Sequence, residues 1–353
     1  MKYFIKTFGC QMNVSDSERI AGFYESQGWK LAKSISDADE IIIVTCSVRQ
    51  TAEDRVYGLV HNLTSRIKNL NHRSHRKKQR AQRIILTGCM MRYPLKWLKD
   101  KLPQVDEFRR ISDFKIGNWK LAIRNSSSHA FVPIMEGCNQ FCSYCVVPSA
   151  RGREKSRPFE EIICEVKELA KKGYQEITLL GQNVNSYGKD SNELIHLKKK
   201  WFAELLKEIH KIKSLKKISF LTSNPWDLTD EIIEAMKLPK IERYLHLPVQ
   251  SGDNEILRKM NRKYTAKDYI RLVEKIRQQI PDIRIGTDII VGFPGETKKQ
   301  FQKTINLCKK VGFVKAYIAM YSPRLGTAAF KLKDDVSLKE KKRRWKILND
   351  LIN

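Results

Sequence analysis

The feature that most constrains this chain is a pattern near its N-terminus in which an apolar run ends in a cysteine. The pattern occurs three times, at residues 3–10, 41–46 and 84–89. Each run is typical of a buried strand, and helical patterns separate the runs, such as residues 15–27 with Ser15 or Asp16 as the N-cap. Strands that alternate with helices indicate a parallel sheet. We therefore predict an α/β fold in which residues 1–125 form a doubly wound parallel-sheet domain.

The three cysteines that end these runs, Cys10, Cys46 and Cys89, are expected to lie together. In a parallel sheet the carboxyl ends of neighbouring strands face one crevice, where ligands bind. Three thiolates without a fourth suit an iron–sulfur cluster that keeps one iron open. The alternative is that each cysteine is only the small residue with which a buried strand often ends. Three such positions favour the cluster.

A second group of cysteines, Cys138, Cys142 and Cys145, has the spacing C-x3-C-x2-C. Three thiolates in one short loop do not complete a tetrahedral zinc site, and no histidine lies nearby in the sequence. They do suit a 4Fe-4S cluster with one iron left open for a substrate. Cys164 and Cys308 lie in amphipathic stretches, and we interpret both as buried small hydrophobic residues.

The alternation of strands and helices resumes after a linker at residues 125–128, with a longer period. Six strands are predicted, at residues 131–135, 176–180, 217–221, 244–247, 283–290 and 316–320. Helical patterns lie between them, at residues 158–171, 201–212, 229–236, 266–279 and 298–311. Six β/α units are too few for a closed eight-stranded barrel. Residues 130–353 are therefore predicted to form an open partial (β/α)6 barrel.

Polar segments follow the predicted barrel strands, where barrel-like β/α folds place their chemistry. They lie at residues 181–188, 222–225, 248–252, 287–296 and 321–324. Any one of them alone is explained by a turn, since Gly, Asn and Pro punctuate loops. Together on one rim they predict a ligand cavity. Neither the dinucleotide motif G-x-G-x-x-G nor the P-loop motif occurs.

Basic residues are in large excess, with 67 Lys and Arg against 39 Asp and Glu, a net charge of 67 − 39 = +28. Such a charge attracts polyanions, nucleic acid first and anionic membranes second. The alternative is a lysine-rich proteome in which lysine merely covers solvated faces. No apolar run reaches the roughly 20 residues that a membrane helix needs. The N-terminus shows neither a signal peptide nor a transit peptide, so we predict a cytoplasmic protein.

The basic residues also cluster locally. Residues 72–83 contain six Lys or Arg and no acid, and a predicted helix at residues 339–345 contains five. A run of this kind usually marks a solvated loop, and the alternative is neutralisation of nucleic-acid phosphates. We predict RNA contacts after the second cysteine group and within the first basic run, at Arg151, Arg153, Arg76, Lys77 and Lys78.

The C-x3-C-x2-C motif, with the aromatic Tyr144 before its last cysteine, resembles that of the radical S-adenosylmethionine (SAM) superfamily. Together with the N-terminal cysteines it resembles the methylthiotransferases. Three segments are most similar to the MiaB-type tRNA methylthiotransferases: residues 7–13, residues 46–55 and residues 181–188. The similarity runs from about residue 1 to about residue 345. Such proteins usually continue into a TRAM domain that grips tRNA. The sequence given ends at Asn353 without one, so either it is truncated or tRNA affinity comes from elsewhere.

The resemblance implies an enzyme that adds a methylthio group to carbon 2 of N6-isopentenyladenosine next to the tRNA anticodon. It implies two 4Fe-4S clusters and two SAM molecules per turnover. The C-x3-C-x2-C cysteines would hold the radical-generating cluster, and the N-terminal cysteines would hold an auxiliary one. One SAM would methylate a sulfur associated with the auxiliary cluster, and the second would supply the radical that attacks the base. All six cysteines would then be catalytic.

The superfamily's habits also imply the residues and partners around SAM. The Tyr144 backbone would meet the SAM adenine, and the pocket would be lined by Gln182, Asn183, Ser223, Gln250 and Asp288. The partners would be the anticodon stem-loop of tRNA, with the target adenosine splayed out, and an electron donor such as flavodoxin or ferredoxin. We expect a monomer that does not bind a membrane.

Two alternatives stay open at this point. The first is a sister methylthiotransferase that acts on threonylcarbamoyladenosine in tRNA or on an aspartate of a ribosomal protein. All these enzymes share both cysteine groups, and only the 46–55 and 181–188 segments favour isopentenyladenosine. The second is a catalytically idle paralogue without a TRAM domain that serves as an iron–sulfur or RNA-binding scaffold.

Overall fold

The computed structural model describes residues 1–73, 82–114, 128–190 and 201–353, with the backbone alone for residues 64–73. The chain divides into two compact units: Met1–Ser126 with Ser149–Arg151, and Ser127–Pro148 with Gly152–Asn353. The predicted boundary between residues 125 and 130 falls largely outside the described residues. Within the described part of the chain, no helix combines the length and the apolar character needed to cross a membrane.

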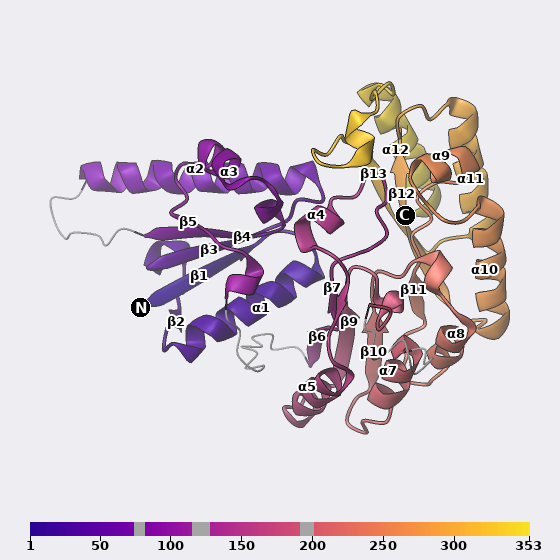
Figure 1. Cartoon of the computed structure of the whole chain (residues 1–353), viewed down its shortest axis with the longest axis horizontal. Helices are drawn as coiled ribbons and strands as arrows, with labels where there is room; N and C mark the ends of the chain where they lie inside the picture. Colours follow the sequence, from indigo (N-terminus) through magenta and orange to yellow (C-terminus); the bar gives the residue numbers. More distant parts are fainter. Residues whose placement is uncertain (74–81, 115–127, 191–200) are drawn as a thin grey trace. The chain divides into compact units, whose positions relative to one another are not determined.

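The first unit is built on a parallel sheet, drawn from indigo to purple in Figure 1. The described strands are β1 (Lys2–Thr7), β2 (Lys30–Leu31), β3 (Glu40–Thr45), β4 (Arg83–Gly88) and β5 (Glu107–Phe108), in the order β2-β1-β3-β4-β5. Every residue of β3 is buried, as expected for a strand covered on both faces. The strand order reverses between β1 and β3, which is the topological switch point where such sheets bind ligands. The predicted doubly wound sheet is confirmed.

Helices cover both faces of this sheet. On one face, Ile20 and Tyr24 of α1 (Gln11–Ser26) pack with Ile42 and Val44 of β3. The other face is covered by α2 (Gln50–Arg73) and α3 (Leu95–Lys101), which pack against alternate residues of the same strands. Because successive strand residues point to opposite faces, the continuous apolar runs of the sequence supply both cores at once.

The predicted start of the first helix was wrong. The helix begins at Gln11 with Cys10 as its N-cap residue, and not at Ser15 or Asp16. Ser15 and Asp16 are buried within the helix. The polar residues of this segment make tertiary contacts: the Asn13 side-chain amide donates to the Thr45 carbonyl at 2.7 Å. Amino-acid composition alone does not distinguish polar residues that make tertiary contacts from polar residues that cap a helix.

The second unit contains two three-stranded parallel sheets among its described residues. One has the order β6-β9-β10 and the other β11-β12-β13; their bounds are β6 (His129–Pro133), β9 (Glu176–Leu180), β10 (Lys217–Phe220), β11 (Tyr244–His246), β12 (Arg284–Val291) and β13 (Lys315–Met320). A parallel bridge between Ile218 and Ile241 links the two halves. Among the described strands, β6 and β13 do not pair, so the predicted open (β/α)6 barrel is confirmed.

The helices of this unit surround the sheets (Figure 1). Those predicted from the sequence are α5 (Phe159–Lys171), α7 (Trp201–His210), α8 (Asp230–Met236), α10 (Ala266–Gln279) and α11 (Lys298–Val311). Sequence reasoning missed α4 (Val147–Arg151) and α9 (Asn254–Lys259), and it found only part of α12 (Leu338–Ile352). The predicted strand 131–135 also divides: β6 ends at Pro133, and Met135 opens a short hairpin of β7 (Met135–Glu136) with β8 (Lys155–Ser156).

The burial predicted for Cys164 was wrong, whereas that predicted for Cys308 is confirmed. Cys164 lies on the exposed face of α5, because Ile162, Ile163 and Val166 point into the core. A cysteine can lie on either face of an amphipathic helix. Its position relative to the apolar residues of the helix decides whether it is buried or exposed.

Candidate active site

The N-terminal cysteines lie where the sheet of the first unit ends. In the sheet register, Thr7 pairs with Val44 and Thr45 pairs with Gly88, so Cys46 and Cys89 each follow directly from paired residues. Gly9 lets the segment that carries Cys10 lie close to Cys46, because a Cβ added at Gly9 would lie only 2.8 Å from the Cβ of Cys46. The register therefore brings these three loops to one edge of the sheet.

Thr45 connects the loops around these cysteines. Its hydroxyl donates to the Thr87 carbonyl at 2.6 Å and accepts from the Met90 amide at 3.0 Å, while its own carbonyl accepts from Asn13. Asn13 in turn accepts a weak bond from the Cys10 thiol at 3.4 Å. One threonine thus joins the segments that carry Cys10 and Cys89.

Part of the 46–55 segment has a structural role. The sequence did not distinguish these structural residues from residues that take part in the reaction. Glu53 is buried and accepts hydrogen bonds from the hydroxyls of Ser47 and Tyr93, and the Arg92 side chain donates to Ser47 at 2.6 Å. A buried carboxylate needs such partners. The network holds the turn that follows Cys46.

The thiols of this site differ in their surroundings. Cys10 is exposed, whereas Cys46 and Cys89 are buried. Burial raises the pKa of Cys46, and it raises the pKa of Cys89 to about 11, although Arg151 opposes the shift at Cys89. Burial disfavours a bare thiolate, which a bound metal centre stabilises. The chemistry of this donor set therefore fits an iron–sulfur group.

Arg151 lies in the first unit, although it follows the second cysteine group in the sequence. Its guanidinium pairs with Asp16 at 2.6 Å, and the two side chains are only 5% and 7% exposed. This burial does not support the phosphate contact that we predicted for Arg151. Sequence reasoning could not separate it from Arg153, since both are arginines of one basic segment.

The second cysteine group occupies a loop of the second unit that is held by the last residue of α9 and the two residues after it. The Ser143 amide donates to the Met260 carbonyl at 3.1 Å, and its hydroxyl donates to the Lys259 carbonyl at 2.7 Å. The Asn261 side chain donates to the Phe141 carbonyl at 3.0 Å. These contacts fix the middle of the loop, on either side of Cys142.

Arg262 is a site residue that sequence reasoning missed. One of its guanidinium nitrogens lies 3.4 Å from the Cys142 sulfur, and another donates to the Pro248 carbonyl at 2.9 Å. Its guanidinium also lies over the rings of Trp226 and Tyr264, at 4.6 Å and 5.3 Å from their centroids. In the sequence it belongs to an ordinary Arg-Lys pair, so no signal in the pattern pointed to it.

The thiols of this loop also suit a bound group. Burial raises the pKa of Cys138 to about 11 and that of Cys145 to about 12. Among the described residues, no three His, Cys, Asp or Glu side chains are placed to hold a metal ion. A 4Fe-4S cluster is larger than one ion, since each thiolate binds its own iron. The donor set of three thiols beside one arginine therefore fits a cluster.

Gln182 is one of the rim residues that we predicted near SAM, and it contacts the cysteine loop directly. Its side-chain oxygen accepts from the Gly137 amide at 2.5 Å. Gly137 has a φ of 80° and lies so close to the Arg153 carbonyl that an added Cβ would collide with it. Gly137 therefore meets both conditions that require glycine, a left-handed backbone and close contact.

Gly137→Ala is expected to destabilise the second unit more than Gly152→Ala does. Gly152 has a similar φ of 78° but no atom within 4 Å of an added Cβ. The backbone strain costs about 1–3 kcal/mol at either position, and the collision at Gly137 adds about 1–3 kcal/mol. Denaturant unfolding followed by circular dichroism measures both variants. Equal losses would show that the close contact with Arg153 does not constrain the loop.

The other predicted SAM residues lie at strand ends of the second unit. Asn183 donates to Ser186 and accepts from Asn224, within a buried network around Asp227. Ser223 is buried, and its hydroxyl has no hydrogen-bond partner among the described residues. An orphaned buried hydroxyl is what a ligand would satisfy.

The remaining three predicted residues differ in accessibility. Gln250 is buried, has a φ of 67°, and bridges to Ile289 of β12. Asp288 is partly exposed and lies 3.2 Å from the His246 ring. Tyr144 packs against the apolar cluster around Met260 and Phe293. The part of these residues in binding SAM stays a prediction.

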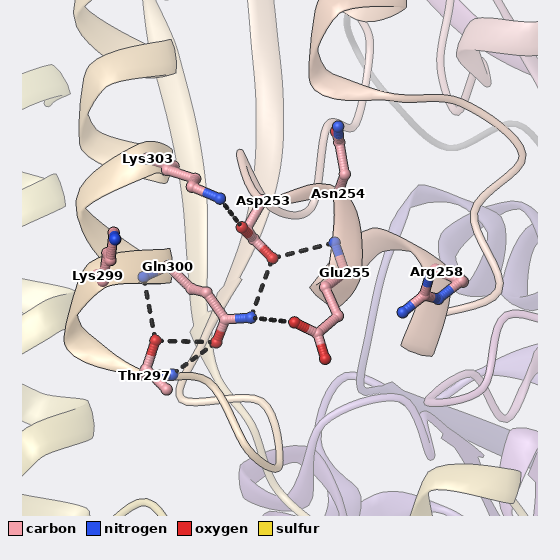
Figure 2. Close-up of a pocket in the computed structure, with 8 residues that line it drawn as sticks. All are labelled: Asp253, Asn254, Glu255, Arg258, Thr297, Lys299, Gln300 and Lys303. Carbon is pink, nitrogen blue, oxygen red and sulfur yellow. Dashed lines mark hydrogen bonds and ion pairs between the residues drawn. The ribbon is translucent and has the colours of Figure 1, made fainter.

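An open pocket of about 590 Å³ lies between the start of α9 and the start of α11 (Figure 2). Figure 2 shows Asp253 at its centre, where it accepts from Lys303 at 2.7 Å and from Gln300 at 3.2 Å. Asp253 and Thr297 also cap the two helices. These groups already bind one another, and α9 leads directly into the segment that holds the cysteine loop. We assign the pocket a supporting role.

The predicted RNA contacts are described only in part. Arg76, Lys77 and Lys78 lie outside the described residues. Arg153 is exposed, and its guanidinium lies 4.4 Å from the ring centroid of Phe141, which is exposed as well. This pair presents an aromatic face and a positive charge together, which is how single-stranded nucleic acids are often bound.

Two families match the chain. Residues 132–308 match the radical SAM superfamily, and residues 2–109 match the uncharacterized protein family UPF0004. Each match falls largely within one of the two units.

Proteins with the name tRNA-2-methylthio-N(6)-dimethylallyladenosine synthase are similar to the whole chain. The chain is 44% identical over 381 positions to that of Thermoanaerobacter sp. (strain X514), covering 99% of this chain and 78% of the relative. It is 42% identical to that of Thermotoga petrophila over 384 positions, covering 99% and 81%. It is also 42% identical to that of Clostridium botulinum (strain Hall), covering 100% and 81%.

Solved structures share the fold at low identity. The radical SAM methyltransferase TsrM from Kitasatospora setae, with cobalamin and a 4Fe-4S cluster bound, superposes with a TM-score of 0.61 at 12% identity. That match covers 93% of this chain and 76% of TsrM. The cobalamin-dependent radical SAM enzyme OxsB gives 0.59 at 10% identity, over 99% of this chain and 55% of OxsB.

Proposed function

The chain belongs to the family of the tRNA-2-methylthio-N(6)-dimethylallyladenosine synthases, and on that premise we propose how its two cysteine groups serve the reaction. It is a radical SAM tRNA methylthiotransferase that adds a methylthio group to N6-isopentenyladenosine. The observation that carries this conclusion is identity of 42–44% across essentially the entire chain. The sister enzymes and the idle paralogue are not favoured, because the relatives reported share one name.

We propose that Cys138, Cys142 and Cys145 hold a 4Fe-4S cluster that binds SAM. Bound there, the cluster and SAM supply the one-electron chemistry that the unactivated C–H bond at carbon 2 of adenine requires. The chain's own residues fix the loop: Arg262 contacts the Cys142 sulfur, and Gln182 accepts from the Gly137 amide. The unpartnered Ser223 hydroxyl, with Tyr144, Asn183, Gln250 and Asp288, is proposed to orient SAM.

We propose that Cys10, Cys46 and Cys89 hold a second, auxiliary cluster in the first unit, residues 1–125, while residues 130–353 carry the SAM chemistry. The support is the convergence of three strand-end loops on one sheet edge, at the switch point where doubly wound sheets bind ligands. Bound there, the auxiliary group would supply the sulfur for the methylthio group.

The partners are proposed from the surface and from the chemistry. The anticodon stem-loop of tRNA would be bound through Arg153, with Arg76, Lys77 and Lys78 as further phosphate contacts. The exposed Arg153 and Phe141 support this, since RNA loops are read by stacking and by charge. An electron donor such as flavodoxin or ferredoxin would reduce the cluster. We propose that the protein acts as a monomer in the cytoplasm.

Mass spectrometry of digested tRNA tests the function. The gene is expressed in a strain that lacks its own methylthiotransferase, and 2-methylthio-N6-isopentenyladenosine is expected to appear while N6-isopentenyladenosine falls. The matched control is the Cys138→Ala variant, which is expected to leave the tRNA unchanged. Methylthiolation of threonylcarbamoyladenosine in the same digest would identify a sister activity. No modified product at all would contradict the proposal.

A further inference from the structure

A buried arginine contacts the three-cysteine site of the first unit. Arg151 is the last residue of α4, and Ser149–Arg151 belong to the first unit by their contacts. Its side chain is 5% exposed and lies 2.6 Å from the Asp16 carboxylate. Burying a charge is costly unless it is paired, so this position requires Asp16 or another negative group.

The site supplies such a group. The Arg151 guanidinium lies within hydrogen-bonding reach of the Cys89 side chain, and the Asp16 carboxylate that pairs with it lies close to the same thiol. Asp16 lies on α1, the helix whose N-cap residue is Cys10. The ion pair therefore connects the segments that carry two of the three cysteines.

We propose that Arg151 and Asp16 are a positioning pair for the group held by Cys10, Cys46 and Cys89, in which Arg151 supplies positive charge to it and Asp16 orients the guanidinium. The inference rests on the proposed function, since it assumes that these cysteines hold an iron–sulfur cluster. Net charge and hydrogen bonds to sulfur set the reduction potential of such a cluster. The pair should therefore tune that potential.

The experiment isolates the N-terminal site. In the full chain, Cys138, Cys142 and Cys145 are changed to Ala, so that only the first unit can hold a cluster. The protein is reconstituted anaerobically with iron and sulfide, and its iron content and reduction potential are measured. If this parent protein binds no iron, the two-cluster proposal fails. If it binds about four irons, the arginine can be tested.

Opposite shifts are expected from the two partners. Arg151→Met removes a positive charge and should lower the potential, whereas Asp16→Asn removes a negative charge and should raise it. A purely structural ion pair predicts the same direction for both, because both variants break the same contact. Arg151→Met should also hold its iron about 10–100-fold less tightly in competition with a chelator, as is typical when an outer-shell partner is removed.

Two further variants complete the test. Arg151→Lys keeps the charge and should retain the parent potential and most of the iron. Arg83→Gln is the matched control: Arg83 pairs with Glu40 and Glu107 at the opposite end of β4 from Cys89, so its loss should leave the potential unchanged. If Arg151→Met prevents cluster binding, iron retained by Arg151→Lys supports the proposal. A Lys variant no better than the Met variant, or shifts of one sign for Arg151→Met and Asp16→Asn, would overturn it.

Discussion

Replacing Cys142 with alanine is expected to abolish both SAM cleavage and methylthio transfer. Cys142 is the cysteine of its loop whose sulfur contacts Arg262, at 3.4 Å. Its loss removes a proposed cluster ligand, and it also leaves the partly buried Arg262 guanidinium without its sulfur partner, so the loop loses two interactions. Chromatography of 5′-deoxyadenosine and mass spectrometry of tRNA measure the two activities. The iron content should fall from about eight per chain to about four.

Cys164→Ala is the control for this experiment. Cys164 is exposed on α5 of the same unit, so its replacement removes a thiol without touching a proposed ligand. Iron content and both activities should equal those of the unmodified protein. A Cys142→Ala variant that still cleaved SAM at the same rate would remove the second cysteine group from the mechanism.

Cys46→Ala is expected to separate the two activities. It removes a buried thiol of the first unit, so methylthio transfer should fall below detection while SAM is still cleaved to 5′-deoxyadenosine. The reason is that the proposed ligands of the SAM cluster all lie in the second unit. The variant should retain about four irons. The same chromatographic and mass-spectrometric measurements report both outcomes.

Cys308→Ala serves as the matched control, because Cys308 is a buried thiol on α11 that belongs to neither group. It should keep both activities, with only the small loss of stability that follows removal of a buried atom. Loss of SAM cleavage together with methylthio transfer in Cys46→Ala would contradict the proposed division of labour between the two units.

The predictions that succeeded depend on local patterns. The apolar runs predicted the strands of both units, because a strand buried on both faces must be apolar at consecutive positions. The number of strands predicted an open barrel, and the cysteine spacings predicted the family. These inferences need only residue order and period.

The predictions that failed depend on which partner a side chain meets. Ser15 and Asp16 are residue types that favour the N-cap position. They are nevertheless buried within α1, because the helix already begins at Gln11 with Cys10 as its N-cap residue. Cys164 is on the exposed face of its helix because the neighbouring isoleucines take the core. Composition is the same in either arrangement, so composition could not decide.

The sequence by itself therefore determined the family and the α/β fold class, and it predicted which six cysteines serve as ligands, since each of these depends on spacing along the chain. Only the tertiary structure decided which charged residues lie next to those cysteines. Arg262 reaches Cys142 across 120 residues of sequence, and Arg151 pairs with Asp16 across 135. Removing an arginine from water has a desolvation cost, which must be offset by a partner group. Folding brings that partner from a distant part of the chain, so no local sequence pattern predicts the pair.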